Sequence, residues 1–375
     1  MATSVFTWGG QAIALSQPCS IVMKRSHSML SFLPTVLLRQ SMKARIKVSV
    51  CSGEYVPHGA VTGRCSQPLW LTVPGAKHTK IGSEVMSKVQ APPGYQIVGF
   101  DFDAMEAVLA GLYGDSTFGV VGATPLSYAN FAGSKEAGTD AHSMTAKMVG
   151  ISRSEAKTLA YACLYGAGVK KLALTLWASD KSKPFAACER TAKEFLEKKK
   201  GKRPRGSKMY AGGSDSPNYN AITAIVNQEV PREPVLRRAM STAIRPAAVG
   251  NDFITSRNNW VIQAAGNSLL QIVLTMMEYY RVEHALDGWL SHTVHDQVCY
   301  VVADTDVEEF AQWLKIAHLY SYATLLENLG IPEMPTALAF PATIDVCRVW
   351  TKIPNKPIMT VSSPSGIDTT GRQIK

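Results

Sequence analysis

The chain has 375 residues, 46% of them hydrophobic, so it is long enough to bury a large core in one or two domains. Its formal net charge of +10 at pH 7 favours attraction to a polyanion without deciding which one. The seven cysteines form no CxxC pair, which argues against a zinc ribbon, and no apolar run approaches the ~18 residues of a membrane span.

The first part of the chain has a strongly biased composition. Residues 1–53 contain no Asp or Glu but six Lys and Arg together with many serines. This composition is typical of a mitochondrial transit segment, because a cationic amphipathic segment is attracted to the import machinery and the membrane potential. An unrelated N-terminal segment is an equally good interpretation. Residues 1–55 are therefore assigned only as a basic N-terminal segment.

A strand followed by a helix is predicted in residues 95–106. The apolar run YQIVGF fits a buried strand, and the residues after it fit a helix that begins near Ala104. Asp101 comes at the end of the strand, where a carboxylate that faces a cleft can hold a hard divalent cation. The alternative is that this carboxylate only marks the passage from strand to helix.

The clearest helix boundaries lie in the middle of the chain. Ser152, with Glu155 three residues later, is a capping box that starts a helix, and the glycines at 166 and 168 provide its exit. The sequence therefore predicts a helix over residues 153–165.

Four side chains of this central helix fall on one face. Arg153, Lys157, Tyr161 and Tyr165 are each four residues apart, so they advance by only about 40° per step. Two cations followed by two aromatic rings suit a nucleoside triphosphate, which has a polyphosphate at one end and a flat base at the other. A surface helix with solvated cations and tyrosines packed on a core has the same spacing.

Two further segments flank the central helix. Before it, Asp140 is expected to cap a helix that carries His142. After it, residues 198–206 are a dense run of cations with Pro and Gly. This run predicts a flexible loop that can track phosphates, although a merely solvated loop fits equally well.

The remaining elements follow in the last third of the chain. Residues 255–280 predict a long amphipathic helix, and residues 290–302 predict two short apolar strands that present Asp296 at a tight turn. A helix that reaches about residue 328 comes next. Residues 349–375 are rich in Pro and Ser, so a mobile tail is expected there.

Three of these segments, in this order, resemble motifs A, B and C of family A DNA polymerases, and the residues around them resemble the mitochondrial polymerase gamma branch. The matching positions are Asp101 in motif A, Arg153, Lys157 and Tyr165-Gly166 in motif B, and His295-Asp296 in motif C. The resemblance implies an α+β fold, with an antiparallel palm sheet and helical fingers. It implies a palm and fingers over residues 56–348, with the fingers at about 140–250, and without the exonuclease domain and most of the thumb.

The resemblance also implies roles for individual residues. Asp101 and Asp296 would be the catalytic carboxylates that hold two Mg²⁺ ions, with the carbonyl of Phe102 as a further ligand. The residues expected to bind the nucleotide are Arg153, Lys157 and His142 at the triphosphate, Tyr165 against the nucleotide, and Tyr161 and Glu106 at the sugar. The residues expected to contact DNA are Arg64, in a Thr-Gly-Arg turn, Arg257, Asn259, Gln263 and His295.

The implied reaction is template-directed DNA synthesis in mitochondrial DNA replication, in the matrix nucleoid. The primer 3′ hydroxyl attacks the α-phosphate of a dNTP and releases pyrophosphate. Implied partners are primer-template DNA, dNTPs and an accessory processivity subunit, with no membrane. Two alternatives stay open: a single-subunit RNA polymerase, in which Glu106 is not expected, and a degenerate or truncated polymerase that binds nucleic acid without synthesis. The second alternative is favoured by Gln297, which stands where motif C usually has Glu.

Overall fold

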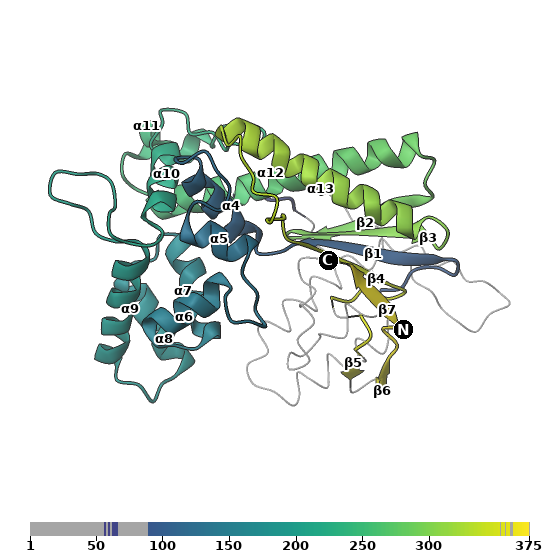
Figure 1. Ribbon diagram of the computed structural model, residues 1–375, viewed down its shortest axis with the longest axis horizontal. Helices are drawn as coiled ribbons and strands as arrows, with labels where there is room; N and C mark the ends of the chain where they lie inside the picture. Colours follow the sequence, from purple (N-terminus) through teal and green to yellow (C-terminus); the bar gives the residue numbers. More distant parts are fainter. Residues whose placement is uncertain are drawn as a thin grey trace.

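The computed structural model of the chain describes residues 56–57, 59–60, 62–66, 89–352, 354–356, 358–360 and 363–374. These residues form a mixed α/β structure, in which long helices cover one face of an antiparallel sheet and a second group of helices stands beside the sheet (Figure 1). The expected α+β class with an antiparallel sheet is confirmed. The basic segment 1–55 lies outside the described residues, so its interpretation stays a prediction.

The main sheet has five strands in the order β2-β3-β1-β4-β7, and each neighbouring pair is antiparallel. The strands are β1 (Tyr95–Phe102), β2 (Gly288–Val294), β3 (Gln297–Ala303), β4 (Ala342–Cys347) and β7 (Gly371–Ile374). Because side chains alternate along a strand, β1 places Phe100 and Phe102 on one face and Asp101 on the other. The first face is apolar, and the second carries the candidate catalytic carboxylate.

The apolar face of the sheet belongs to the larger of the described cores. Helix α13 (Val307–Leu329) packs on β1 and β3, α12 (Ile254–Glu283) packs along α13, and α4 (Met105–Asp115) continues the same core (Figure 1). The rings of Phe100 and Phe102 meet edge to face, with centroids 4.9 Å apart, and both contact His318 of α13. Burial lowers the pKa of His318 to about 4, so this histidine is a neutral core residue.

A second core lies among the helices beside the sheet. These helices are α5 (Pro125–Phe131), α6 (Ala141–Val149), α7 (Arg153–Leu164), α8 (Val169–Ser179), α9 (Phe185–Lys199) and α10 (Ser216–Val226), followed by the short turns η3 (Thr242–Ile244) and α11 (Pro246–Val249). Leu159 of α7, Leu172 of α8 and Phe195 of α9 are fully buried against one another. The loop between α9 and α10, which carries the cation run, extends away from the helices (Figure 1).

Several local sequence signals have the expected structural result. Ser152 and Glu155 form the complete capping box at the start of α7, and the Asp140 side chain caps α6. Strands β2 and β3 are joined by a turn of His295 and Asp296. The predicted helix boundaries and the predicted hairpin are therefore confirmed.

The end of the chain differs from the prediction of a mobile tail. Residues 371–374 form β7, which pairs with the edge of β4, and residues 358–367 contain the small hairpin of β5 (Ile358–Thr360) and β6 (Ser363–Ile367). The Asn355 backbone amide donates to the Thr369 carbonyl at 2.8 Å. The physical reason is that β4 would otherwise present unpaired backbone groups, which a further strand satisfies.

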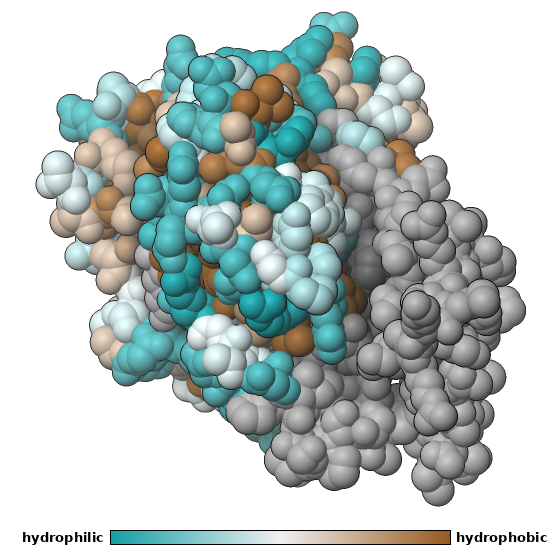
Figure 2. Space-filling model, turned by 90° about the vertical axis from the view of Figure 1, so that its right-hand side faces the viewer, coloured by the Kyte–Doolittle hydropathy of each residue, from teal (hydrophilic) through white to brown (hydrophobic). Residues whose placement is uncertain are grey.

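Among the described residues, helix α12 is long and apolar enough, by length and composition, to cross a membrane. However, 72% of its most apolar stretch is buried inside the protein, and a core helix passes the same test. The described surface on the side of the sheet opposite the second helical group shows hydrophilic and hydrophobic residues interspersed (Figure 2). We therefore interpret α12 as a core helix.

Candidate active site

The first candidate carboxylate lies at the passage from β1 to α4. This passage bends sharply at Ala104, whose φ of +50° lies in the left-handed region that side chains other than glycine rarely adopt. Asp101 is partly buried on the face of the sheet opposite the core. Its Oδ2 accepts a hydrogen bond from Lys352 Nζ at 2.9 Å, whereas its Oδ1 is buried with no hydrogen-bond partner. Asp101 therefore presents one unsatisfied, electron-rich oxygen.

The second candidate carboxylate is presented by the β2–β3 turn, next to Asp101. His295 has a φ of +58°, which allows the two-residue turn to reverse the chain tightly. Burial, together with the negative charge of Asp101, raises the pKa of Asp296 to about 6. Desolvation, Arg64 and Lys352 lower the pKa of His295, with Asp101 acting in the opposite direction. The two carboxylates therefore share one electrostatic environment.

These carboxylates fit a pair of divalent cations. Carboxylate oxygens are the hard ligands that Mg²⁺ prefers, and the orphaned Asp101 Oδ1 is a buried acceptor that a cation would satisfy. Among the described residues, no group of three His, Cys, Asp or Glu side chains converges as a closed metal cage. Such an open site suits Mg²⁺, which keeps several waters and takes oxygens from substrate phosphates. The Phe102 side chain is buried in the core, so only its main chain can serve as the predicted ligand.

A polar cluster borders the two carboxylates and joins four of the predicted site residues. Arg64 forms a short ion pair with Glu106 of α4. Burial raises the pKa of Tyr165, and hydrogen bonding to Glu106 adds to this effect, while hydrogen bonding to Gln263 opposes it. The cluster thus links the Thr-Gly-Arg turn, α4, the end of α7 and α12. The roles predicted for these residues at the sugar and the primer terminus stay predictions.

The glycine of the Thr-Gly-Arg turn packs the turn against α12. Gly63 has a φ of +79°, its carbonyl accepts from Asn267 Nδ2 at 2.7 Å, and a Cβ at this position would lie 3.0 Å from the Ala264 side chain. Both the conformation and the close approach require glycine. The packing of Gly63 on α12 fixes the backbone position from which the Arg64 side chain reaches Glu106.

Two of the predicted triphosphate residues, Arg153 and Lys157, lie at the start of α7, and the third, His142, lies on the neighbouring α6. Arg153 donates to both oxygens of Asp140, at 2.7 and 3.2 Å, and Lys157 is exposed. Although desolvation raises the pKa of Asp140, the hydrogen bonds from Arg153 and Ser143 lower it to about 2. Desolvation lowers the pKa of His142 to about 4, and the charges of Lys157 and Arg153 contribute, so this histidine is a neutral neighbour of two cations.

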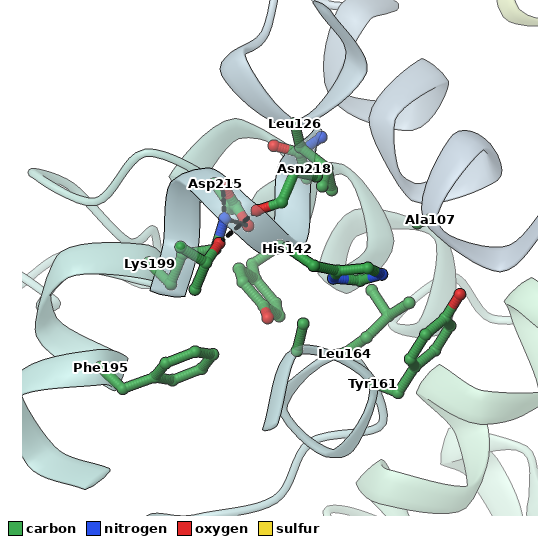
Figure 3. A pocket seen from close by; sticks show the side chains of 13 residues that line it. Ala107, Leu126, His142, Tyr161, Leu164, Phe195, Lys199, Asp215 and Asn218 are labelled. Atoms are coloured by element: carbon green, nitrogen blue, oxygen red, sulfur yellow. Dashed lines mark hydrogen bonds and ion pairs between the residues drawn. The ribbon is translucent and has the colours of Figure 1, made fainter. Parts of the chain in front are cut away.

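A pocket lies next to these residues, lined from α4, α5, α6, α7, α9 and α10 (Figure 3). The rings of His142 and Tyr161 line it with centroids 5.8 Å apart, and the buried ion pair of Lys199 with Asp215 lines it as well (Figure 3). Most of the lining is apolar, with Leu126, Leu164 and Phe195 among its residues. A triphosphate would lose its hydration in this apolar pocket, so the pocket does not suit a triphosphate, and Lys157 lies outside its lining.

The structure corrects the prediction for Arg257. This side chain is fully buried, and its Nη2 donates to the backbone carbonyls of Gly250 and Asp252, at 3.0 and 3.3 Å. It stabilises the loop before α12 and is not available to DNA. The neighbouring Asn259 is partly exposed, and its Oδ1 is buried without a partner. For Asn259, Gln263 and His295 the DNA contact stays a prediction.

Two site residues could not be found from the sequence. Lys352 follows β4 and bonds to Asp101, and Asp345 lies on β4 opposite Gly99, with only 4% of its surface exposed. Burial raises the pKa of Asp345 to about 6, and Asp101 adds to this rise. Neither residue belongs to a recognisable motif, and only the register of β4 beside β1 brings them to the site.

Comparisons with known proteins agree with this geometry. No protein-family model matches the chain. DNA polymerase gamma of Komagataella pastoris is 36% identical over 317 residues, which cover 84% of this chain and 31% of that protein. For DNA polymerase gamma of Saccharomyces cerevisiae the identity is 35% over 316 residues, with coverages of 83% and 25%. The chain is homologous to DNA polymerase gamma. It spans between 25% and 31% of the length of these two relatives.

The homology extends to animal polymerase gamma, and the fold agrees with it. DNA polymerase subunit gamma-1 of Xenopus laevis is 30% identical over 371 residues, covering 86% of this chain and 31% of that protein. Among solved structures, the POL domain of Pol1 from M. smegmatis, in complex with DNA primer-template and dNTP, matches with a TM-score of 0.60 and 14% identity. The match covers 88% of this chain and 51% of that chain. At this identity the likeness establishes the fold, which is that of a family A POL domain.

Proposed function

We propose that the chain carries the polymerase site of a mitochondrial DNA polymerase of the gamma type and extends a primer with dNTPs. The observation that carries the proposal is the meeting of Asp101 and Asp296, from separate segments. They lie close to α7, because the charge of Asp296 contributes, after burial and Glu106, to the raised pKa of Tyr161. Primer extension by the chain, on a labelled primer-template with four dNTPs and Mg²⁺, tests it. A chain that binds the DNA but never extends it would favour the non-enzymatic alternative.

Different residues of the site would serve different steps of nucleotidyl transfer. Two bound Mg²⁺ ions would supply activation of the 3′ hydroxyl and stabilisation of the leaving pyrophosphate. Asp101 and Asp296 would hold these ions, while Lys157 and Arg153 would bind the triphosphate through charge-assisted hydrogen bonds. The neutral His142 can donate one hydrogen bond to a phosphate oxygen without adding charge. Tyr161 and Tyr165 would then face the sugar and base.

The wider assignments of the proposal rest on homology. We assign the palm and fingers to residues 56–348, with the fingers at about 140–250, and primer-template DNA and dNTPs as partners. The relative from Neurospora crassa is named as mitochondrial, which supports a mitochondrial location for this chain as well. An accessory processivity subunit remains a proposed partner.

Sugar selection distinguishes DNA synthesis from RNA synthesis. Glu106 is held by Arg64 and Tyr165, so its side chain narrows the space beside the sugar. Glu106→Ala should raise incorporation of ribonucleotides relative to deoxyribonucleotides by about tenfold or more, since one added or lost packing contact has effects of that size. Single-nucleotide incorporation kinetics with matched rNTP and dNTP measure this ratio.

Glu106→Gln is the matched control for that experiment. It keeps the size of the side chain and removes only its charge, so it should preserve more of the sugar discrimination than alanine does. If the unaltered chain itself prefers ribonucleotides, the RNA polymerase alternative becomes the better assignment.

The loop between α9 and α10 offers a test of DNA binding away from the catalytic carboxylates. Lys202, Arg203, Arg205 and Lys208 are all exposed, and Arg203 lies over the Tyr210 ring at 4.4 Å. Replacing the four cations with Gln should weaken DNA binding and reduce the slope of log affinity against log salt by about 0.9 for each lost phosphate contact. Fluorescence anisotropy over a salt series measures both quantities.

The control for the loop is a set of four cations on α8, on α9 and on the turn between them. Lys170, Lys171, Lys181 and Lys193 are exposed, so their replacement with Gln gives the same change in net charge. Equal salt slopes for the two quadruple variants would show that the loop is merely solvated.

A further inference from the structure

Lys352 places an ammonium group directly beside the catalytic carboxylates. Its Nζ lies 2.9 Å from Asp101 Oδ2, and its charge also acts on Asp296 and Asp345. The side chain is 38% exposed, so it is shielded from much of the solvent. An ammonium in this position neutralises part of the charge that a divalent cation would otherwise meet.

The backbone before Lys352 is firmly anchored. Trp350 is 2% exposed, and its backbone amide donates to the Val89 carbonyl at 2.9 Å. Its indole Nε1 donates to Gln297 Oε1 at 3.4 Å, and its ring meets His292 edge-on with centroids 4.2 Å apart. Thr351 is also buried. Two buried residues in succession hold the chain so that the ammonium reaches Asp101.

The carboxylates outnumber this ammonium at the site. Asp345 is buried beside Gly99 and accepts from Gln373 Nε2 at 2.7 Å, so it adds a third acidic group to Asp101 and Asp296. Asp101 and Asp345 lie on the same face of the sheet, because Gly99 and Asp101 are two residues apart on β1. Lys352 thus bonds to the one carboxylate that still has a free buried oxygen.

We infer that Lys352 is a counter-cation built into the site, which holds Oδ2 of Asp101, leaves Oδ1 as the oxygen that faces a divalent cation, and weakens the binding of that cation. The inference rests on the proposed function, since the cation is the one that polymerase chemistry needs. Removing the ammonium should therefore strengthen metal binding, because a positive charge near the ion is lost while both carboxylates remain.

Direct Mn²⁺ binding to the full chain without DNA tests this inference, with free Mn²⁺ measured by electron paramagnetic resonance. Lys352→Met should bind Mn²⁺ about tenfold more tightly than the unaltered chain, a modest part of the full Coulomb effect. Lys352→Arg keeps the charge, so its Mn²⁺ affinity should stay within about threefold of that of the unaltered chain. Lys356→Met is the matched control, because Lys356 is exposed on the same segment.

The outcomes separate this inference from the proposed function. Unchanged or weaker Mn²⁺ binding by Lys352→Met overturns the proposed role of Lys352 as a counter-cation. If Asp101→Asn binds Mn²⁺ as the unaltered chain does, the metal lies elsewhere and the proposed site is wrong. In Asp101→Asn with Lys352→Met, the gain from removing the ammonium should largely disappear. Lys352→Gln gives the neutral comparison if Lys352→Met is unfolded by circular dichroism, and equal binding by Lys352→Gln and Lys352→Arg also overturns the inference.

Discussion

Asp101→Asn and Asp296→Asn should each reduce primer extension by about 10³-fold or more, since each removes a charged ligand at the reacting centre. Asn keeps the size of the side chain and one of its oxygens, so the strand and turn that present it should persist. Binding of primer-template should remain nearly intact, because most of its free energy comes from phosphate contacts elsewhere. Single-turnover extension and fluorescence anisotropy measure the two effects separately.

Asp252→Asn is the matched control for both substitutions. Asp252 is exposed just before α12, so losing its charge changes net charge equally without touching the site. Extension by Asp101→Asn or Asp296→Asn at a rate close to that of Asp252→Asn would contradict the assignment of the carboxylates. Loss of DNA binding in step with extension would instead indicate that the substitutions unfold the palm.

The parts of the site that could be predicted are those that residues close together in the sequence determine. The capping box of Ser152 and Glu155 fixes the start of α7 with two neighbouring side chains, and the face spacing follows from helix geometry. The turn at His295 and Asp296 likewise depends on two flanking apolar runs. These local structures depend on residues close in sequence, so they can be predicted without knowing which distant segments pack against them.

The parts that could not be predicted depend on pairing between distant segments. Lys352 reaches Asp101 across 251 residues of sequence, and only the antiparallel register of β1 with β4 brings them together. Arg257 shows the reverse error, because its match to a family position implied DNA contact, whereas its guanidinium donates to the loop carbonyls before α12. Neither outcome has a signal in the residues that neighbour Lys352 or Arg257 in the sequence.

Gln297 is where the sequence departs from motif C, and its surroundings define the second large effect. It pairs in register with Asp101, so the two side chains lie side by side on one face of the sheet. It is 1% exposed, its Oε1 accepts from Trp350 Nε1, and its Nε2 is buried without a partner. A carboxylate at this position would keep the tryptophan bond and add a negative charge beside Asp101.

Gln297→Glu should therefore destabilise the chain in the absence of divalent cations. Side chains in register lie about 5 Å apart, and two unit charges at that distance repel by about 3 kcal/mol at an effective dielectric constant of about 20. The free energy of unfolding in urea should fall by about that amount, and saturating Mn²⁺ should restore most of it. The Mg²⁺ concentration for half-maximal extension should also be lower than for the unaltered chain, which we expect to need high Mg²⁺ or Mn²⁺.

The control is Gln297→Met, which has a similar length but no charge and no acceptor for Trp350. It should lose about 1 kcal/mol from the missing hydrogen bond, and Mn²⁺ should stabilise it no more than it stabilises the unaltered chain. The diagnostic quantity is thus the gain in unfolding free energy on adding Mn²⁺, compared between the Glu and Met variants. Equal gains in the two variants would mean that position 297 lies outside the electrostatic reach of the ions, even though its neighbour in register is Asp101.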